Sequence, residues 1–225
     1  MRESILGIDV GAVSVSAALV APDGRLLRGT SRPHGGEIET CLHTCLDALQ
    51  AGGATRVVTR STPRSIAAAH RADNLVAAIR AAQTLHPGLG ALLLVGGERF
   101  SLSLFDSEGI YRESRFNSLC AAGTGSFLDQ QARRLGLADS AAIGETALRA
   151  DGERPRIATR CAVFAKTDLI HAQQEGFSLE AICDGLCHGL AANVLDALVS
   201  GRPLPDPVVF AGGVAHNPAV VAHMR

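Results

Sequence analysis

Gly7-Ile8-Asp9-Val10-Gly11-Ala12-Val13-Ser14 is the stretch of sequence that decides the fold of this chain. The apolar residues around it predict a buried strand over 4–10, and Gly11 predicts a tight turn into a second strand that begins at Ser14. Asp9 therefore stands where a strand ends beside a glycine turn. A carboxylate in this place is suited to hold Mg²⁺ or its water near a phosphate, whereas the plainer alternative is an Asp that caps an ordinary hairpin.

The same order of elements occurs again in the second half of the chain. Each half has a strand that ends in a glycine turn, a second strand, an acidic-glycine turn, a third strand and a helix. Gly11 and Gly24 are thirteen residues apart, and so are Gly96 and Gly109. We therefore predict an α/β fold with two similar lobes of βββα type, although two such units can also resemble each other by chance.

Hydrophobic periodicity gives the expected limits of these elements. Strands are expected over 4–10, 14–20, 25–30, 56–59, 91–95, 100–105, 110–116 and 208–211, and helices over 37–51, 65–85 and 126–135, after Cys161, after Ser178 and near Asn217. The connection over 138–155 is polar and is expected to be less regular. The two lobes are expected to cover residues 1–89 and 90–225.

The composition describes a globular α/β protein and argues against several classes of function. Of the 225 residues 47% are apolar, and the net charge of −1 gives no sign of a surface that binds nucleic acid. No apolar run approaches the roughly 18 residues of a membrane span, and Asp9 interrupts the apolar core that a signal peptide needs. We expect a cytoplasmic protein with reduced thiols and with no nucleic acid or membrane partner.

Two further glycine turns follow buried strands in the second half, at Gly96-Gly97 and at Gly212-Gly213. Backbone N–H groups at such turns bind phosphate oxygens, so the three turns together favour a nucleotide held between two lobes. Glu98 is the carboxylate nearest to the second turn. It is a candidate catalytic group, and a solvated turn residue is the alternative.

The six cysteines fall into two groups. Four lie on the apolar stripes of expected helices and are interpreted as core residues: Cys41, Cys45, Cys183 and Cys187. Cys120 and Cys161 instead each precede an expected helix, where the helix dipole lowers the pKa of a thiol and favours metal ligation. Two thiolates are half of the ligands of a four-Cys cluster, and a homodimer with its two-fold axis through the cluster would supply the rest. Buried structural cysteines are the alternative.

Four motifs together resemble one known family. The ATP-dependent activators of 2-hydroxyacyl-CoA dehydratases, and the related ATPase subunits of benzoyl-CoA reductases, carry in the same order Gly7-Ile8-Asp9-Val10-Gly11, Cys120-Ala121-Ala122-Gly123-Thr124-Gly125-Ser126-Phe127-Leu128-Asp129, Cys161-Ala162-Val163-Phe164-Ala165 and Gly212-Gly213-Val214-Ala215-His216-Asn217. The Cys-Ala-Ala-Gly-Thr-Gly stretch is the most specific part. The glycine turns alone are shared with all sugar-kinase, actin and Hsp70-like ATPases.

The resemblance implies an actin-like ATPase fold that binds ATP or ADP with Mg²⁺. It implies Asp9 as a catalytic residue, with Glu98 in place of the acidic residue of the second lobe. The nucleotide-binding residues that it implies are Gly11, Ala12, Val13, Ser14, Gly96, Gly97, Gly212, Gly213, Val214 and Asn217. It further implies a homodimer bridged by one [4Fe-4S] cluster on Cys120 and Cys161 of each chain, which passes a low-potential electron to a partner iron–sulfur dehydratase or reductase.

The sequence departs from the family pattern at several places. Ala12 and Val13 stand where members often have Ser-Thr, and the second turn reads Leu94-Val95-Gly96-Gly97-Glu98-Arg99 where they often have Asp-Ile-Gly-Gly-Gln-Asp. The chain also ends at Arg225, before the C-terminal strand and helix that in the family return to the first lobe. Two rival functions stay open: an ATP-dependent sugar or small-molecule kinase of the same fold, and a catalytically weak nucleotide-binding module of a larger activator.

Overall fold

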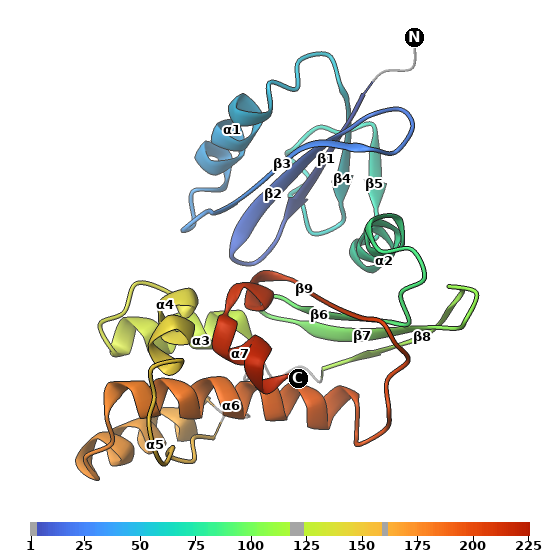
Figure 1. The fold of residues 1–225 in the computed structure, drawn as a ribbon. Helices are drawn as coiled ribbons and strands as arrows, with labels where there is room; N and C mark the ends of the chain where they lie inside the picture. Colours follow the sequence, from blue (N-terminus) through green and yellow to red (C-terminus); the bar gives the residue numbers. More distant parts are fainter. Residues whose placement is uncertain (1–3, 118–123, 159–161) are drawn as a thin grey trace. The chain divides into compact units, whose positions relative to one another are not determined.

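The computed structural model describes residues 4–117, 124–158 and 162–225 (Figure 1). They form two compact units, Met1–Ala81 and Ala82–Arg225, and the boundary falls inside helix α2 (Asn74–Leu85). The lobe limits expected from the sequence, 1–89 and 90–225, place the boundary after this helix and stay a prediction. Each unit is built on its own mixed sheet.

The first unit is a five-stranded sheet with one helix packed on it. Its strands are β1 (Ile5–Val10), β2 (Ser14–Val20), β3 (Leu26–Pro33), β4 (Thr55–Thr59) and β5 (His70–Ala72), in the order β3-β2-β1-β4-β5. Helix α1 (Ile38–Leu49) lies on one face of this sheet (Figure 1). Alternate side chains of β1 and β2 meet the apolar stripe of α1, which includes Cys41 and Cys45, in one core.

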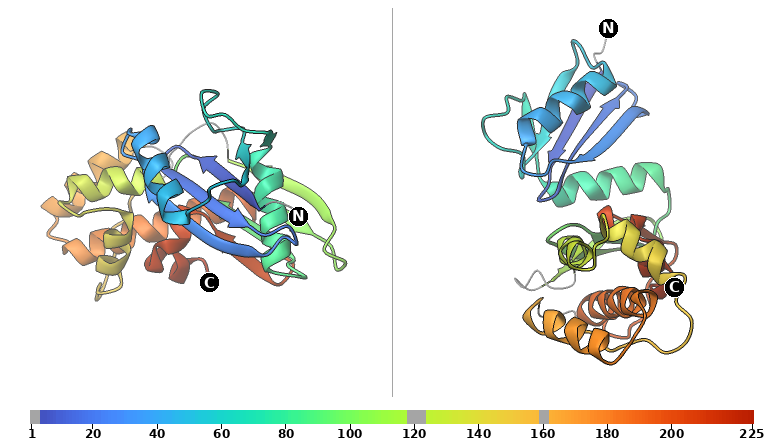
Figure 2. Two further views of the ribbon diagram at one scale, coloured as in Figure 1. Left: turned by 90° about the horizontal axis from the view of Figure 1, so that it is seen from above. Right: turned by 90° about the vertical axis from the view of Figure 1, so that its left-hand side faces the viewer.

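The second unit combines a four-stranded sheet with a layer of helices. Its strands are β6 (Ala91–Val95), β7 (Phe100–Phe105), β8 (Tyr111–Phe116) and β9 (Val208–Ala211), in the order β8-β7-β6-β9. The helices are α3 (Gly125–Arg134), α4 (Ser140–Ala147), α5 (Ala162–Gln174), α6 (Leu179–Leu198), the 3-10 helix η1 (Gly213–His216) and α7 (Pro218–His223). Figure 2 shows α5 alongside α6. All these helices share one core with β6 and β7.

Backbone hydrogen bonds repeat from one unit to the other. The β1–β2 turn is closed by a bond of 2.9 Å from Gly11 N to Ser14 O, and the β6–β7 turn by a bond of 2.8 Å from Gly96 N to Arg99 O. In the next hairpin of each unit, a glycine with positive φ donates its N–H to the carbonyl three residues earlier, at 2.9 Å in both. The predicted repeat of strands and turns is confirmed.

The helix expected over 65–85 is wrong in its first half. His70–Ala72 is strand β5, parallel to β4, and the helix begins only at Asn74. The guanidinium of Arg71 donates hydrogen bonds of 2.7, 3.1 and 3.0 Å to the carbonyl oxygens of Thr62, Pro63 and Ile66. These bonds fix the backbone ahead of β5, and residues 67–69, although rich in Ala, are irregular despite their helical propensity.

The connection expected over 138–155 to be irregular contains helix α4. Asp139 caps this helix, because its Oδ1 accepts the N–H of Ala142 at 2.9 Å. Ile143 is its single large apolar residue, so the periodicity that predicts a helix is weak. A Cβ added to Gly144 would lie 2.4 Å from the Asn217 side-chain oxygen. Close backbone packing therefore holds α4 in place where large side chains are missing.

Helix α6 is the longest helix of the second unit, and it begins where the sequence predicts. Ser178 caps it by accepting the N–H of Ala181 at 3.1 Å. Within the described part of the chain, α6 is also the one helix long and apolar enough to cross a membrane by composition. Its apolar residues lie in the core of the unit, and 61% of the stretch is buried. This burial is typical of a core helix.

Candidate nucleotide-binding site

Asp9 lies at the edge of the first sheet where three parallel strands end. β1, β4 and β5 run in the same direction, with Ile8 paired with Val58 and Thr59 paired with Ala72. In α/β sheets ligands bind outside the carboxyl ends of such strands. The residues that follow β4 and β5 are therefore brought next to Asp9, although they are far from it in the sequence.

Three side chains donate hydrogen bonds to the Asp9 carboxylate, and all three donate to Oδ1. Thr59 Oγ1 is 2.5 Å from this oxygen, Ser61 Oγ 3.0 Å and Asn74 Nδ2 3.1 Å. The sequence singled out Asp9 but none of these partners. The only sequence signal for them is that each stands at or just after the end of a strand. For Asn74 this signal was missed, because the sequence predicted a helix where β5 lies.

The β1–β2 turn lies beside this carboxylate. A Cβ added to Gly11 would be 4.0 Å from Asp9 Oδ2, so this second oxygen faces the turn. Ala12 is exposed, and Val13 is half-buried with its carbonyl accepting the N–H of His34 at 3.0 Å. Ser14 begins β2. A carboxylate oxygen and the backbone of a short glycine turn therefore lie side by side. The carboxylate is suited to bind Mg²⁺, and the N–H groups of the turn are suited to bind phosphate.

The β6–β7 turn is the counterpart of this turn, but the strand before it has no carboxylate in the place of Asp9. Leu94 stands two residues before Gly96, as Asp9 stands two residues before Gly11. Glu98 is exposed within the turn itself. Its position therefore does not repeat that of Asp9, and its catalytic role stays a prediction.

The start of α3 is attached to the β6–β7 turn. Gly125 N donates to Gly96 O at 3.0 Å, and Ser126 N donates to Gly97 O at 2.9 Å. The Ser126 hydroxyl donates to the same Gly97 oxygen. A Cβ added to Gly125 would lie 3.2 Å from both Gly96 O and the Val214 side chain. The second turn, the first residues of α3 and η1 therefore meet at one point.

The third glycine turn packs against the end of β6. Gly212 has φ of 97°, and a Cβ there would lie 2.3 Å from the carbonyl oxygen of Val95. Asn217 is buried, and its Oδ1 accepts the N–H of Val220 at 2.9 Å while its Nδ2 donates to Ser140 O at 2.6 Å. Its amide therefore caps α7 and ties it to α4, and a contact with nucleotide stays a prediction.

Replacing Gly212 with Ala is expected to lower the free energy of unfolding by about 2–4 kcal/mol, since the added methyl meets a backbone oxygen and the residue needs a left-handed φ. Gly213→Ala is the matched control, because no atom lies within 4 Å of a Cβ at that position. Urea unfolding of the two variants measures the difference. Equal unfolding midpoints would contradict the close approach of Gly212 to β6.

The two cysteines predicted as cluster ligands, Cys120 and Cys161, lie outside the described residues. The other four are buried free thiols, as predicted: Cys41, Cys45, Cys183 and Cys187. Burial raises the pKa of Cys183 and of Cys187 to about 12, and burial with the neighbouring Cys41 raises the pKa of Cys45. These three thiols therefore keep their protons at neutral pH, which disfavours metal ligation by them.

Asp9 fits a magnesium ion better than it fits a metal with several protein ligands. Among the residues of the described ranges, no group of three or more His, Cys, Asp or Glu side chains is placed to hold a metal. A cation at Asp9 would thus have one protein carboxylate and take its other ligands from phosphate and water. Mg²⁺ usually binds in this way, because it keeps several waters and dehydrates reluctantly.

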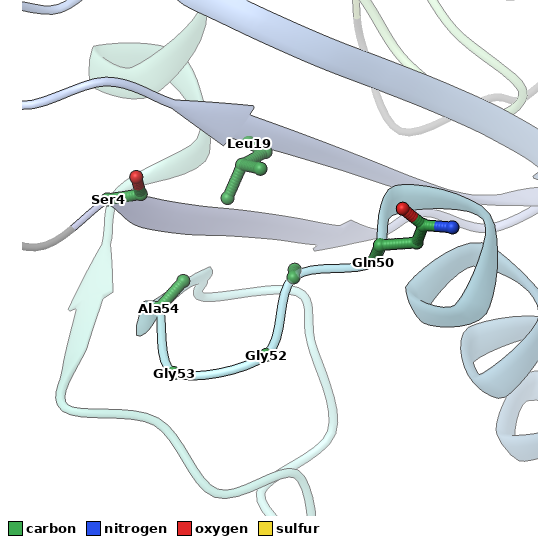
Figure 3. A pocket seen from close by; sticks show the side chains of 7 residues that line it. Ser4, Leu19, Gln50, Gly52, Gly53 and Ala54 are labelled. Carbon is green, nitrogen blue, oxygen red and sulfur yellow. The ribbon is translucent and has the colours of Figure 1, made fainter.

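Two surface pockets lie away from the predicted site residues. The first, of about 280 Å³, is lined by Ser4, Leu19, Gln50, Ala51, Gly52, Gly53 and Ala54 (Figure 3). It is at the amino end of β1, opposite to Asp9. The second, of about 350 Å³, lies between residues 153–156 and α5. Neither includes a glycine turn that was predicted to bind the nucleotide.

A protein-family profile matches residues 6–225, which is nearly the whole chain. The chain belongs to the BadF/BadG/BcrA/BcrD ATPase family. The resemblance inferred from the four sequence motifs is therefore confirmed. Nucleotide binding is the property that membership of this ATPase family supports directly.

Relatives of this BadF/BadG/BcrA/BcrD family member include both uncharacterised proteins and named activators. Uncharacterized protein YjiL of Escherichia coli K12 is 27% identical over 216 residues, which are 94% of this chain and 82% of that protein. The 2-hydroxyisocaproyl-CoA dehydratase activator of Clostridioides difficile is 30% identical over 138 residues, which are 61% of this chain and 51% of that protein. The match thus spans about half the length of that activator.

A solved structure shows the fold of the family. The activator of the 2-hydroxyisocaproyl-CoA dehydratase from Clostridium difficile, with bound ADPNP, superimposes with a TM-score of 0.86 at 23% identity. The superposition covers 98% of this chain and 84% of that chain. The predicted α/β fold of actin-like ATPases is therefore confirmed for this member of the BadF/BadG/BcrA/BcrD family.

Proposed function

We propose that this chain is an ATP-hydrolysing activator that drives one low-potential electron into a partner iron–sulfur enzyme, such as an acyl-CoA dehydratase or reductase. Membership of an ATPase family supports the hydrolysis of ATP. Relatives named as activators of dehydratases, and one named as a subunit of benzoyl-CoA reductase, support the partner. The active form is a homodimer with one shared [4Fe-4S] cluster.

The attachment of α3 to the β6–β7 turn is the observation that carries the proposal. Cys120 precedes the first residue of α3 by five positions, and Gly125 and Ser126 donate their N–H groups to carbonyls of the turn. A change in this turn when a phosphate binds or leaves is therefore transmitted to the start of α3. Because the cysteine segment leads directly into α3 in the sequence, these hydrogen bonds and that of the Ser126 hydroxyl link nucleotide state to the surroundings of the cluster.

Cys120 and Cys161 are the residues that would hold the cluster in each copy. Their positions in the chain support this, since one precedes α3 and the other directly precedes α5. The positive ends of these helices favour negative charge on nearby residues, and hence thiolates. A [4Fe-4S] cluster with four thiolate ligands supplies a reversible one-electron store when it is bound. The chain's own part is to present two thiolates and to change their surroundings with the nucleotide.

Leu94 favours a second candidate function, a catalytically weak nucleotide-binding module of a larger activator. It occupies the position in the second unit that Asp9 occupies in the first. An apolar side chain there leaves the end of β6 without a carboxylate at the place of Asp9, and Glu98, exposed within the turn, does not repeat that position. Such a module would bind nucleotide and turn it over slowly.

Anaerobic purification of the full chain tests both candidates. The activator is expected to be a dimer with about four irons and four sulfides per dimer and to hydrolyse ATP. A clustered dimer without ATP turnover would favour the weak module. A colourless monomer that phosphorylates a sugar would contradict both and favour the kinase alternative.

A further inference from the structure

The two carboxylate oxygens of Asp9 differ in the hydrogen bonds that they accept. Thr59, Ser61 and Asn74 all donate to Oδ1, at 2.5, 3.0 and 3.1 Å. A carboxylate oxygen has two lone-pair directions, so three donors fill its capacity. Among the described residues none donates to Oδ2, and this oxygen is the one that faces the Gly11 turn.

The three donors are fixed by one another and by the backbone. Asn74 Nδ2 also donates to Ser61 Oγ at 2.8 Å, and the backbone N–H of Ser61 returns a bond of 3.2 Å to Asn74 Oδ1. Thr59 Oγ1 lies 3.0 Å from Ser61 Oγ and 3.2 Å from Thr62 Oγ1, which in turn accepts the N–H of Val10 at 3.2 Å. The network therefore locks the orientation of the Asp9 side chain.

We infer that Thr59, Ser61 and Asn74 form a clamp that makes Asp9 a one-oxygen ligand and so selects Mg²⁺ over Ca²⁺. The inference rests on the proposed nucleotide function, and it assigns these three residues a positioning role. Oδ2 is free to bind the cation or one of its waters, while Oδ1 is kept away from it by its three hydrogen bonds.

The chemistry of the two cations makes this clamp selective. Mg²⁺ is small, demands near-ideal octahedral geometry and is commonly held by single carboxylate oxygens together with phosphate and water. Ca²⁺ takes six to eight oxygens and often binds both oxygens of one carboxylate. Binding Ca²⁺ through both Asp9 oxygens would require hydrogen bonds at Oδ1 to break, and hydrogen bonds to a charged group are stronger than those between neutral groups.

Asn74→Ala tests the clamp in the full chain. The variant removes one donor to Oδ1 and the support of Ser61, so the carboxylate can turn. Calorimetric titration with ADPNP in Mg²⁺, in Ca²⁺ and in EDTA gives the gain in affinity that each cation provides. We expect the ratio of the Mg²⁺ gain to the Ca²⁺ gain to fall about tenfold, with affinity in EDTA unchanged.

Two further variants separate positioning from a general structural effect. Arg60→Ala changes the neighbouring residue, whose side chain is 72% exposed and pairs with Asp73 at 3.8 Å, and it should keep the wild-type ratio. In an Asp9→Asn background, Asn74→Ala should no longer change the ratio, because the clamp has no carboxylate to orient. An equal fall in both backgrounds, or in Arg60→Ala, would overturn the clamp.

The same titrations distinguish failure of the clamp from failure of the proposed function. Wild-type protein that does not bind ADPNP in any buffer would overturn the nucleotide function and the clamp with it. If the wild-type protein binds ADPNP more tightly in Mg²⁺, and Asn74→Ala leaves the ratio of the Mg²⁺ gain to the Ca²⁺ gain unchanged, the clamp alone is overturned.

Discussion

Replacing Asp9 with Asn is expected to lower the rate constant of ATP hydrolysis by about 10²–10³-fold. The substitution keeps the shape of the side chain, and the Asn oxygen can still accept from Thr59, Ser61 and Asn74. It removes the negative charge and replaces Oδ2 with an NH₂ group, which cannot bind a cation. Because Leu94 occupies the matching position of the second unit, that unit has no equivalent carboxylate to compensate. Phosphate release at saturating ATP and Mg²⁺ measures the effect.

Asp23→Asn is the control for this prediction. Asp23 is exposed in the β2–β3 hairpin of the same unit, where its Oδ1 accepts the N–H of Arg25 at 3.0 Å. An Asn side chain keeps that bond, so turnover should stay at the wild-type rate. Wild-type turnover in Asp9→Asn would contradict its catalytic role, whereas an equal fall in both variants would point to general damage of the unit.

The strands and glycine turns could be predicted because their signals are local. Alternating apolar residues and a glycine two positions after Asp9 or Leu94 define strand, turn and strand within about twenty residues, and the turn hydrogen bonds then repeat between units. The buried cysteines were predictable for the same reason, since helical spacing placed them on apolar stripes. The fold class follows from these local signals and from their repetition.

Strand β5 and helix α4 could not be predicted, because non-local contacts decide them. β5 forms because it pairs with β4 and because Arg71 binds carbonyls before it. α4 depends on the close approach of Gly144 to Asn217, which is distant in sequence. Local helical propensity is weaker than such contacts in both cases.

In the candidate site, too, some residues could be predicted from local signals and others depend on non-local contacts. Asp9 and the glycine turns were found from their places at strand ends, but the partners of Asp9 stand 50, 52 and 65 residues away. Only the parallel pairing of β1 with β4 and of β4 with β5 brings them together. The link from Gly96 and Gly97 to the start of α3 likewise needs the folded second unit.

Replacing Cys120 or Cys161 with Ala is expected to remove all iron from the protein, whereas Cys183→Ala and Cys187→Ala should keep it. Iron in a cluster is bound by thiolates. Burial raises the pKa of Cys183 and of Cys187 to about 12, so at neutral pH both remain protonated thiols within the core. Iron and sulfide per chain, measured after anaerobic purification, compare the four variants.

The buried cysteines also control for loss of folding. Cys187 packs in the core, and its thiol donates to Asn217 Oδ1 at 3.7 Å, so Cys187→Ala should lower the free energy of unfolding by about 1–2 kcal/mol. A variant that is less stable yet keeps its iron shows that destabilisation alone does not empty the cluster site. Iron retained in both Cys120→Ala and Cys161→Ala would contradict the cluster assignment. If only one of the two substitutions removes the iron, the other cysteine is not a ligand, and a different residue of each chain supplies the second bond to the cluster.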